Sequence, residues 1–287
     1  MDIGIGLPAT IPGVQPGLIV EWARKADDGP FSSLGALDRL VYPNFEAMIS
    51  LAAAAGATNR VRLITTILIA PLRNPGIFAK QAASLDAISG GRLTLGLAVG
   101  GREDDFLAAA ASFQDRGKRF DEQLALMKRV WVGDPVSEDI GSIGPPPVSS
   151  GGPELLIGGS SPRALDRVGK WGDGFIAGGG GPDRSKEAYE TAGQSWEKYG
   201  RKGRPRFVVG AYYALGADAA DKAASYIRDY YSFLGPMADQ IAQGVPSTED
   251  AVKGTIRAFE SVGVDELVLW PCIPEIDQLS RLADLVP

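Results

Sequence analysis

The stretch SLDAISGGRLTLGLAVGGREDDF, residues 84–106, decides how the rest of the chain is interpreted. A helical pattern stops at Gly90-Gly91, where glycine permits the left-handed conformation that ends many helices. The apolar run Leu93–Val99 is too short for a helix and lacks polar alternation, which indicates a buried parallel strand. Gly100-Gly101 then let the backbone approach a ligand closely. Four charges, Arg102–Asp105, follow at the carboxyl end of the strand, where parallel sheets carry their chemistry.

Composition narrows the class of protein. The 287 residues are 45% apolar and 22% charged, as in an ordinary globular protein. No apolar run approaches the ~18 residues of a membrane span, and the chain opens on IGIGL without a basic signal-peptide head, so we expect a cytoplasmic protein and no membrane partner. A net charge of −6 argues against a nucleic-acid partner. With no histidine and a single cysteine, Cys272, the chain excludes histidine triads, and we predict no metal site.

Short apolar strands alternate with helices along the whole chain, which predicts an α/β fold, a (β/α)8 TIM barrel in a single domain over residues 1–287. The predicted strands are 3–7, 33–37, 61–69, 93–99, 154–158, 173–177, 206–214 and 265–270. The main predicted helices are 45–55, 75–88, 119–131, 163–171, 185–199, a long region 218–243, and 248–262. Residues 133–153 are rich in Gly, Pro and Ser and are predicted to be a loop insertion that covers a site.

Two consecutive predicted strands end in glycine-rich exits. One delivers Gly158-Gly159-Ser160-Ser161 to a helix that starts at Pro162, and the next delivers the four glycines 178–181. Small residues, serine hydroxyls and a helix N-terminus together suit a phosphate group. Two simpler interpretations remain open, namely a serine-capped helix at Pro162 and a flexible surface loop at 178–181.

Four segments in order resemble the luciferase-like monooxygenase superfamily. They are ITTILIAPLRNPGIFAKQAASLD (64–86), SGGRLTLGLAVGGREDDF (89–106), RGKRFDEQLALMKRVW (116–131) and LLIGGSSPRALDRVGKWGDGFIAGG (155–179). Members of this superfamily are TIM barrels that use reduced FMN or the deazaflavin coenzyme F-420. The resemblance therefore implies an oxidoreductase that binds FMN or F-420 at the carboxyl face of a barrel.

The resemblance also implies roles for particular residues. In the family, a bulge with a non-prolyl cis peptide in the third strand supports the isoalloxazine ring, which places the ring over Thr65-Thr66. The other residues implied to bind the cofactor are Gly100, Gly158, Gly159, Ser160, Ser161, Gly178 and Gly179, with the phosphate at the start of the helix near Pro162. Aromatic residues near the ends of the last two strands are expected to line the pocket mouth or to fill the core: Tyr212, Tyr213 and Trp270.

Asp38 and Glu103 are the candidate catalytic residues. Asp38 follows the second strand, with a structural ion pair as the alternative, and Glu103 follows the fourth, with a solvated acidic helix turn as the alternative. The chain departs from similar F-420-dependent dehydrogenases at both places. Arg39 stands where a histidine usually follows the aspartate, and Gly101 stands where a glutamate is usual.

The resemblance, together with the missing histidine, implies a monooxygenase that uses O2 and reduced FMN, supplied by a separate flavin reductase, to oxygenate a small organic substrate. The missing histidine is tolerable there because the cofactor carries the chemistry. One alternative is F-420-dependent hydride transfer, with an F-420 reductase as partner and Glu103 moving the proton. An alternative of another class is a cofactor-free binding or assembly subunit. The apolar helix Phe45–Ala55 further predicts a homodimer.

Overall fold

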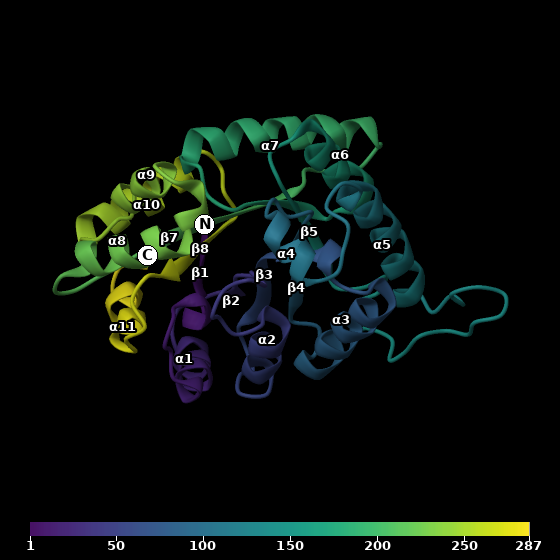
Figure 1. Ribbon diagram of the computed structural model, residues 1–287, viewed down its shortest axis with the longest axis horizontal. Helices are drawn as coiled ribbons and strands as arrows, with labels where there is room; N and C mark the ends of the chain where they lie inside the picture. The colour runs from purple at the N-terminus through teal and green to yellow at the C-terminus, as the bar shows by residue number, and fades with distance from the viewer. Residues whose placement is uncertain (287) are drawn as a thin grey trace.

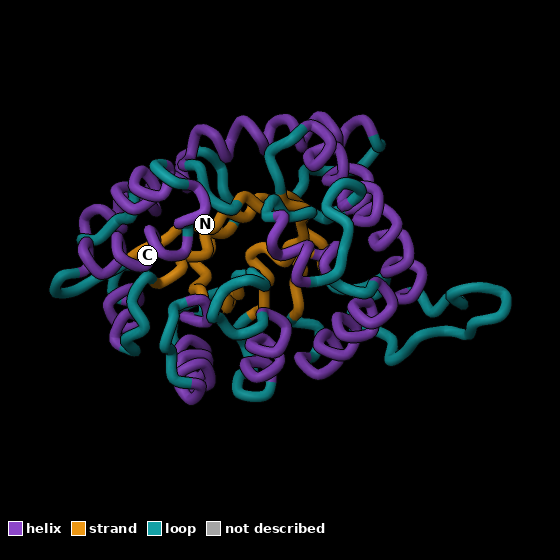
Figure 2. Tube along the Cα trace, viewed as in Figure 1, coloured by secondary structure: helices purple, strands orange, loops and turns teal. Residues whose placement is uncertain are grey.

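A computed structural model, which describes residues 1–286, shows a closed barrel of eight parallel strands in the order in which they occur along the chain. The first and last strands pair to close it, and helices surround the strands on the outside (Figure 1, Figure 2). The strands are β1 (Asp2–Gly6), β2 (Ser33–Ala36), β3 (Arg62–Ile69), β4 (Leu93–Ala98), β5 (Glu154–Gly158), β6 (Gly174–Ala177), β7 (Arg206–Tyr213) and β8 (Glu266–Pro271). The predicted (β/α)8 fold is confirmed.

The predicted helices are present, with two differences: a last helix follows β8 and was not predicted, and one predicted helix is divided. They are α1 (Pro16–Asp28), α2 (Ala47–Ala55), α3 (Pro75–Ser89), α4 (Glu103–Ala108), α5 (Arg116–Trp131), α6 (Pro162–Trp171), α7 (Gly181–Lys198), α8 (Ala219–Tyr230), α9 (Met237–Gln243), α10 (Glu249–Ser261) and α11 (Asp277–Ala283). The continuous helical region predicted over 218–243 is wrong. The 3-10 turn η3 (Ser232–Leu234) and Gly235, with a φ of 56°, separate α8 from α9. No helix among residues 1–286 is long and apolar enough to span a membrane.

Strand β3 carries an irregularity that β4 accommodates. The register between the two strands shifts between Thr65 and Leu68, and the Thr66–Ile67 peptide bond is cis. Gly96 of β4 passes this point so closely that a Cβ there would lie 2.2 Å from the carbonyl oxygen of Thr65. Only glycine therefore fits at this position of β4.

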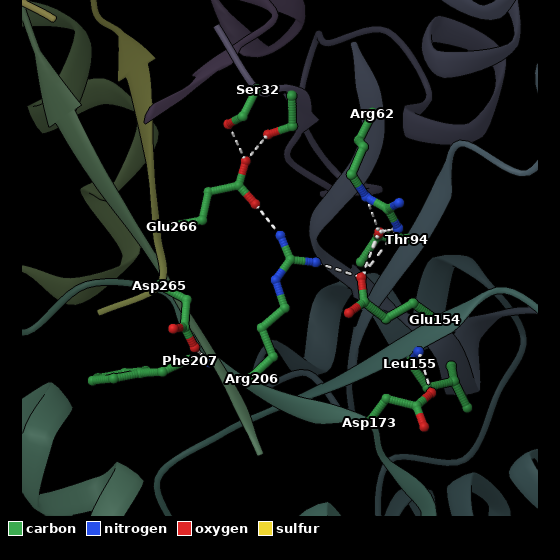
Figure 3. A network of polar contacts seen from close by, with 11 residues as sticks. Ser32, Arg62, Thr94, Glu154, Leu155, Asp173, Arg206, Phe207, Asp265 and Glu266 are labelled. Carbon is green, nitrogen blue, oxygen red and sulfur yellow. Dashed lines mark hydrogen bonds and ion pairs between the residues drawn. The ribbon is translucent and has the colours of Figure 1, made fainter. Parts of the chain in front are cut away.

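Charged side chains close the amino end of the barrel (Figure 3). Arg206, the first residue of β7, pairs with Glu154 at the start of β5 and with Glu266 at the start of β8. Thr94 donates to Glu154 at 2.8 Å and accepts from Arg62 at 2.6 Å. Each carboxylate is thus paired, so this end is a structural plug, and a functional site belongs at the opposite, carboxyl face.

The predicted loop over 133–153 contains no helix and no strand, only an isolated bridge between Ser137 and Ile140. It projects outward from the end of α5, at the right in Figure 1. Its far end is fastened to the barrel by the buried carboxylate of Asp86, which accepts from the backbone N–H of Val148 at 2.8 Å and of Ser149 at 3.2 Å. The loop lines no part of the glycine-rich cavity described below, so it does not cover that site.

Candidate active site

A cavity of about 450 Å³ opens at the carboxyl ends of β4, β5 and β6. We call it the glycine cavity, because glycines from all three strand exits line it. It brings together most of the residues that the resemblance implied for a cofactor: Gly100, Gly158, Gly159, Ser160, Gly178 and Gly179. Apolar side chains, among them Ile67 and Val99, form another part of the wall.

Two of these glycines keep the cavity open. A Cβ on Gly158 would lie 2.7 Å from Cδ1 of Ile67, and a Cβ on Gly159 would lie 2.6 Å from Cβ of Ala164. Gly159 also has a φ of +132°, a conformation that residues with a side chain rarely adopt. Larger residues at these places would therefore fill the cavity or displace the start of α6.

Arg184, in the first turn of α7, is the residue that the sequence analysis missed. Among the described residues, it is the only charged one that lines the glycine cavity, and no carboxylate lines it. The helix begins after Gly180, which has a φ of 102° and provides no side-chain cap. An arginine placed shortly after a run of glycines at a helix start is a signal that the sequence did contain.

The start of α6 is capped by the protein itself. Ser161 Oγ accepts from the backbone N–H of Ala164 at 3.3 Å, and Ser161 does not line the glycine cavity. The serine-capped helix left open by the sequence is thus present at Pro162. The uncapped helix start that faces the cavity belongs to α7.

Thr65 and Thr66 are buried inside the barrel. Thr65 Oγ1 donates to the carbonyl oxygen of Gly96 at 2.8 Å, and Thr66 Oγ1 accepts from Trp270 Nε1 at 2.9 Å. Both hydroxyls are therefore engaged within the protein. The residue of this strand that lines the cavity is the next one, Ile67.

Asp38 lies outside the glycine cavity, in a buried ion pair. Its oxygens accept from Arg73 at 2.8 and 3.0 Å, and Oδ2 also accepts from the backbone N–H of Ile69 at 2.9 Å. Burial alone would lower the pKa of Arg73, but the charges and hydrogen bonds of Asp38 and Glu46 outweigh it and raise that pKa. The geometry is that of the structural ion pair left open by the sequence.

The charged run after β4 divides into two parts. Glu103 and Asp104 are exposed on the first turn of α4, and Glu103 does not line the glycine cavity. Asp105 is fully buried, and its Oδ1 accepts from the backbone N–H groups of Leu40 at 3.2 Å and Val41 at 2.7 Å. Asp105 therefore ties α4 to the loop after β2.

The three aromatic residues near the ends of β7 and β8 are buried and do not line the glycine cavity. Tyr212 and Tyr231 share a hydrogen bond of 3.0 Å between their hydroxyls, and Tyr213 donates to the carbonyl oxygen of Gln278 at 3.3 Å. Burial raises the pKa of Tyr212 and of Tyr213, so both phenols stay neutral. Tyr212 packs against Trp270, and Tyr213 packs against α11 on the other face of β7, so all three are core residues.

Residues 1–270 match the sequence profile of the luciferase-like monooxygenases. The chain belongs to this family. It is 32% identical over 248 residues to an F420-dependent glucose-6-phosphate dehydrogenase of Beutenbergia cavernae, a match that covers 83% of this chain and 65% of that one. The chain spans 57% to 65% of the length of the first curated relatives that it matches.

Solved structures of the luciferase-like fold superimpose over nearly the whole chain. The coenzyme F420 dependent tetrahydromethanopterin reductase of Methanopyrus kandleri has a TM-score of 0.81 at 18% identity and covers 99% of this chain and 98% of its own. The oxygenating constituent of 3,6-diketocamphane monooxygenase of Pseudomonas putida, solved in complex with FMN, has a TM-score of 0.73 at 16% identity, with 99% and 95% covered. At these identities the likeness shows the fold.

Proposed function

We propose that this luciferase-like barrel is an oxidoreductase that binds the phosphate group of FMN or F-420 in the glycine cavity. The observation that carries the proposal is the charge of the cavity wall. Arg184 is unopposed by any carboxylate in the wall, and it stands beside glycine backbone, the Ser160 hydroxyl and the uncapped start of α7. Such a combination favours an oxyanion, through charge and through N–H and O–H donors.

The rest of the wall suits the ring of such a cofactor. Ile67, Ala98 and Val99 provide apolar surface at the ends of β3 and β4, next to the Thr65-Thr66 pair. In this arrangement Arg184, Ser160, Gly178 and Gly179 bind the phosphate, and the apolar residues orient the ring and exclude water.

The geometry favours FMN and monooxygenation over hydride transfer. When bound, reduced FMN supplies two electrons to O2, so that one oxygen atom enters the substrate and the other leaves as water. This chemistry suits a cavity that has no acid or base in its wall: Asp38 is held by Arg73, and Glu103 lies on the exposed turn of α4. A separate flavin reductase would supply the reduced cofactor.

F-420-dependent hydride transfer is the second candidate. A specific observation favours it, because the Beutenbergia relative, 32% identical, is described as F420-dependent. In this version a proton donor is needed beside the ring. Glu103 is the acidic residue nearest in sequence to the cavity residue Gly100, and the F-420 reductase would be a separate protein.

We also propose that two copies of the chain associate through the outer faces of α2 and α3. Ile49 on α2 is 68% exposed and Ile77 on α3 is 61% exposed, which is unusual for isoleucine. The two helices contact each other, and both side chains line one hollow, so they contribute to the same surface.

Titration with FMN, F-420 and riboflavin, each oxidised and reduced and followed by fluorescence, tests the proposed function. We expect saturable binding of FMN or F-420, and weaker binding of riboflavin, which has the ring but no phosphate. Binding of neither phosphate-bearing cofactor in either redox state would contradict the proposal and favour a binding or assembly subunit.

A further inference from the structure

A buried arginine at the carboxyl face has no acidic partner. Arg39, in the loop after β2, is 8% exposed. Its Nη1 donates to the carbonyl oxygen of Tyr230, and its Nε has no hydrogen-bond partner. Among residues 1–286, no carboxylate lies within ion-pair distance of its guanidinium group. A buried charge is costly unless it is paired, so this group is prepared for a negative charge that the chain does not supply.

The two buried carboxylates that flank Arg39 are already occupied. Asp38 faces Arg73 and the backbone N–H of Ile69. Asp105 binds the backbone of the residues that follow Arg39, and its Oδ2 lies 3.5 Å from Nε of Arg102. These contacts fasten the backbone on both sides of Arg39 without neutralising its charge.

Aromatic rings enclose the guanidinium group. Its central carbon lies 4.3 Å from the ring centre of Tyr42, 5.0 Å from that of Tyr230 and 5.4 Å from that of Phe233. The guanidinium carbon of Arg102 lies 4.1 Å from the same Phe233 ring. Two arginines from different strand exits therefore meet at one ring. That ring is 47% exposed, so it is the outer cover of the pair.

Each of the two arginines has buried N–H groups without a hydrogen-bond partner. They are Nε of Arg39 and both Nε and Nη1 of Arg102. The remaining group of Arg102, Nη2, faces Asp104. Arg102 Nε faces Asp105, so Arg39 Nε and Arg102 Nη1 are the two donors without any acidic partner, and they lie with one uncompensated positive charge beneath the Phe233 ring.

We propose that Arg39 and Arg102 bind the carboxylate of the enzyme's substrate, an organic monoanion with an apolar or aromatic body. This inference rests on the proposed function, because the ligand is taken to be the substrate of the proposed oxidoreductase. One uncompensated charge matches a monoanion better than a phosphate dianion, because Arg102 is already paired with two carboxylates. The rings of Tyr42, Tyr230 and Phe233 suit an apolar body, and two donors suit the two oxygens of a carboxylate.

The position of the pair fits delivery of a substrate to the glycine cavity. Gly100 lines that cavity, and Arg102 follows it by two residues in the same strand exit. Arg39 also lines a hollow of about 460 Å³. Its wall includes the apolar Leu40 and Leu72, the carboxylates of Asp38 and Glu46, and the side chains of Ile49 and Ile77 from the proposed dimer surface. Neither arginine lines the glycine cavity, so a carboxylate held by the pair would not occupy the cofactor site.

Calorimetric titration of the full chain at pH 7 tests the proposal, with benzoate, neutral benzamide and phenyl phosphate as probes. We expect benzoate to bind the wild type at least tenfold more tightly than either other probe. Arg39→Gln should weaken benzoate binding at least tenfold, and Arg39→Lys should weaken it less. The control is Arg119→Gln, another arginine of this face that donates to backbone carbonyls, at Ser112 and Pro71, and it should change nothing.

Four results would each overturn the proposal. They are equal affinity of Arg39→Gln and wild type for benzoate, equal affinity of the wild type for benzamide and benzoate, tighter binding of phenyl phosphate than of benzoate, and no binding of benzoate to the wild type. Thermal unfolding of each variant shows whether it is folded. If Arg39→Gln does not fold, the comparison of benzoate binding by Arg39→Lys and wild type tests the proposal. Benzoate and FMN are titrated separately. If FMN or F-420 binds but benzoate does not depend on Arg39, this inference fails alone. If benzoate depends on Arg39 but neither cofactor binds, the proposed function fails alone.

Discussion

Trp270 Nε1 donates a hydrogen bond of 2.9 Å to Thr66 Oγ1, which joins β8 to β3 through the inside of the barrel. Both residues are almost completely buried. The indole fills the interior because β1 and β7 have glycines beside it. A Cβ on Gly6 would lie 2.4 Å from Trp270 Cδ1, and a Cβ on Gly210 would lie 2.1 Å from Cη2. One side chain thus accounts for two glycines and orients the threonine beside the proposed ring site.

We expect Trp270→Phe to destabilise the protein by about 2–4 kcal/mol, because it removes the donor and leaves unfilled volume. Thr66→Val keeps the shape but leaves the indole N–H unpaired, and should cost about 1–3 kcal/mol. Urea unfolding of both single variants and the double variant measures this. The double variant should be less destabilised than the sum of the single ones by roughly 1 kcal/mol. Strict additivity would show that the hydrogen bond contributes nothing.

The barrel was predictable because its signals are local. Apolar runs such as Leu93–Val99 and the glycine stop at Gly90-Gly91 specify strand and helix ends without knowledge of the rest of the chain. The break between α8 and α9 was not predicted. Gly235 and Pro236 lie in an otherwise helical pattern, and the residues before them pack against groups distant in sequence, as Phe233 does against Arg39 and Arg102.

The candidate site was predicted where small residues mark it. Glycines at strand exits are visible in the sequence, and the structure gathers most of them in one cavity. The partners of Asp38 and Asp105 could not be predicted from the sequence, because Arg73 and the backbone of Leu40 and Val41 approach these carboxylates only once the barrel has closed. Whether a carboxylate is free or occupied is a tertiary property.

Asp27 should make stability depend on pH. Burial alone would raise its pKa, but hydrogen bonds from the backbone N–H groups of Asn59, Arg60 and Val61, at 2.8–2.9 Å, outweigh it and lower the pKa. Stabilisation from a lowered carboxyl pKa is present above the unfolded value of about 3.9 and is lost as the pH falls through the folded value.

Asp27→Asn should therefore cost about 1 kcal/mol at pH 7, and the difference from wild type should shrink below about pH 4. Chemical denaturation of both proteins between pH 3 and pH 7 measures this difference in unfolding free energy. The neighbouring exposed Asp28 provides the control as Asp28→Asn, which should change little. A difference independent of pH would exclude the carboxylate as its source.

Ile49→Glu should disrupt the proposed homodimer, because it places a charge in the apolar surface of α2 and α3. Light scattering at micromolar concentration should show a dimer for the wild type and a monomer for this variant. Val132→Glu is a matched control, since Val132 is 61% exposed but follows α5. A monomeric wild type, or a dimer in all three proteins, would contradict the proposed interface.

Gly178→Asp should weaken FMN and F-420 without harming the fold. A Cβ at this position meets only Cδ1 of Ile67, at 3.4 Å, and the backbone is not left-handed, whereas Gly159 has a φ of +132° and would be strained by any side chain. Repulsion between the new carboxylate and a phosphate should cost ~2 kcal/mol, or about thirtyfold in affinity. Asp183→Asn, on the exposed first turn of α7, should leave binding unchanged.

Arg184→Gln distinguishes binding of the cofactor's phosphate from binding of its ring. If Arg184 pairs with the phosphate, its loss removes a charge-assisted contact of about 1.5–3 kcal/mol and weakens FMN roughly ten- to hundredfold. Riboflavin has the same ring but no phosphate, so its affinity should be the same for the variant and the wild type. Because Arg184 is exposed and has no ion pair among the described residues, its replacement should leave the unfolding temperature unchanged. Fluorescence titration of both ligands measures the two affinities, and a variant that weakens FMN and riboflavin equally would show that Arg184 contacts the ring side of the cavity and not the phosphate.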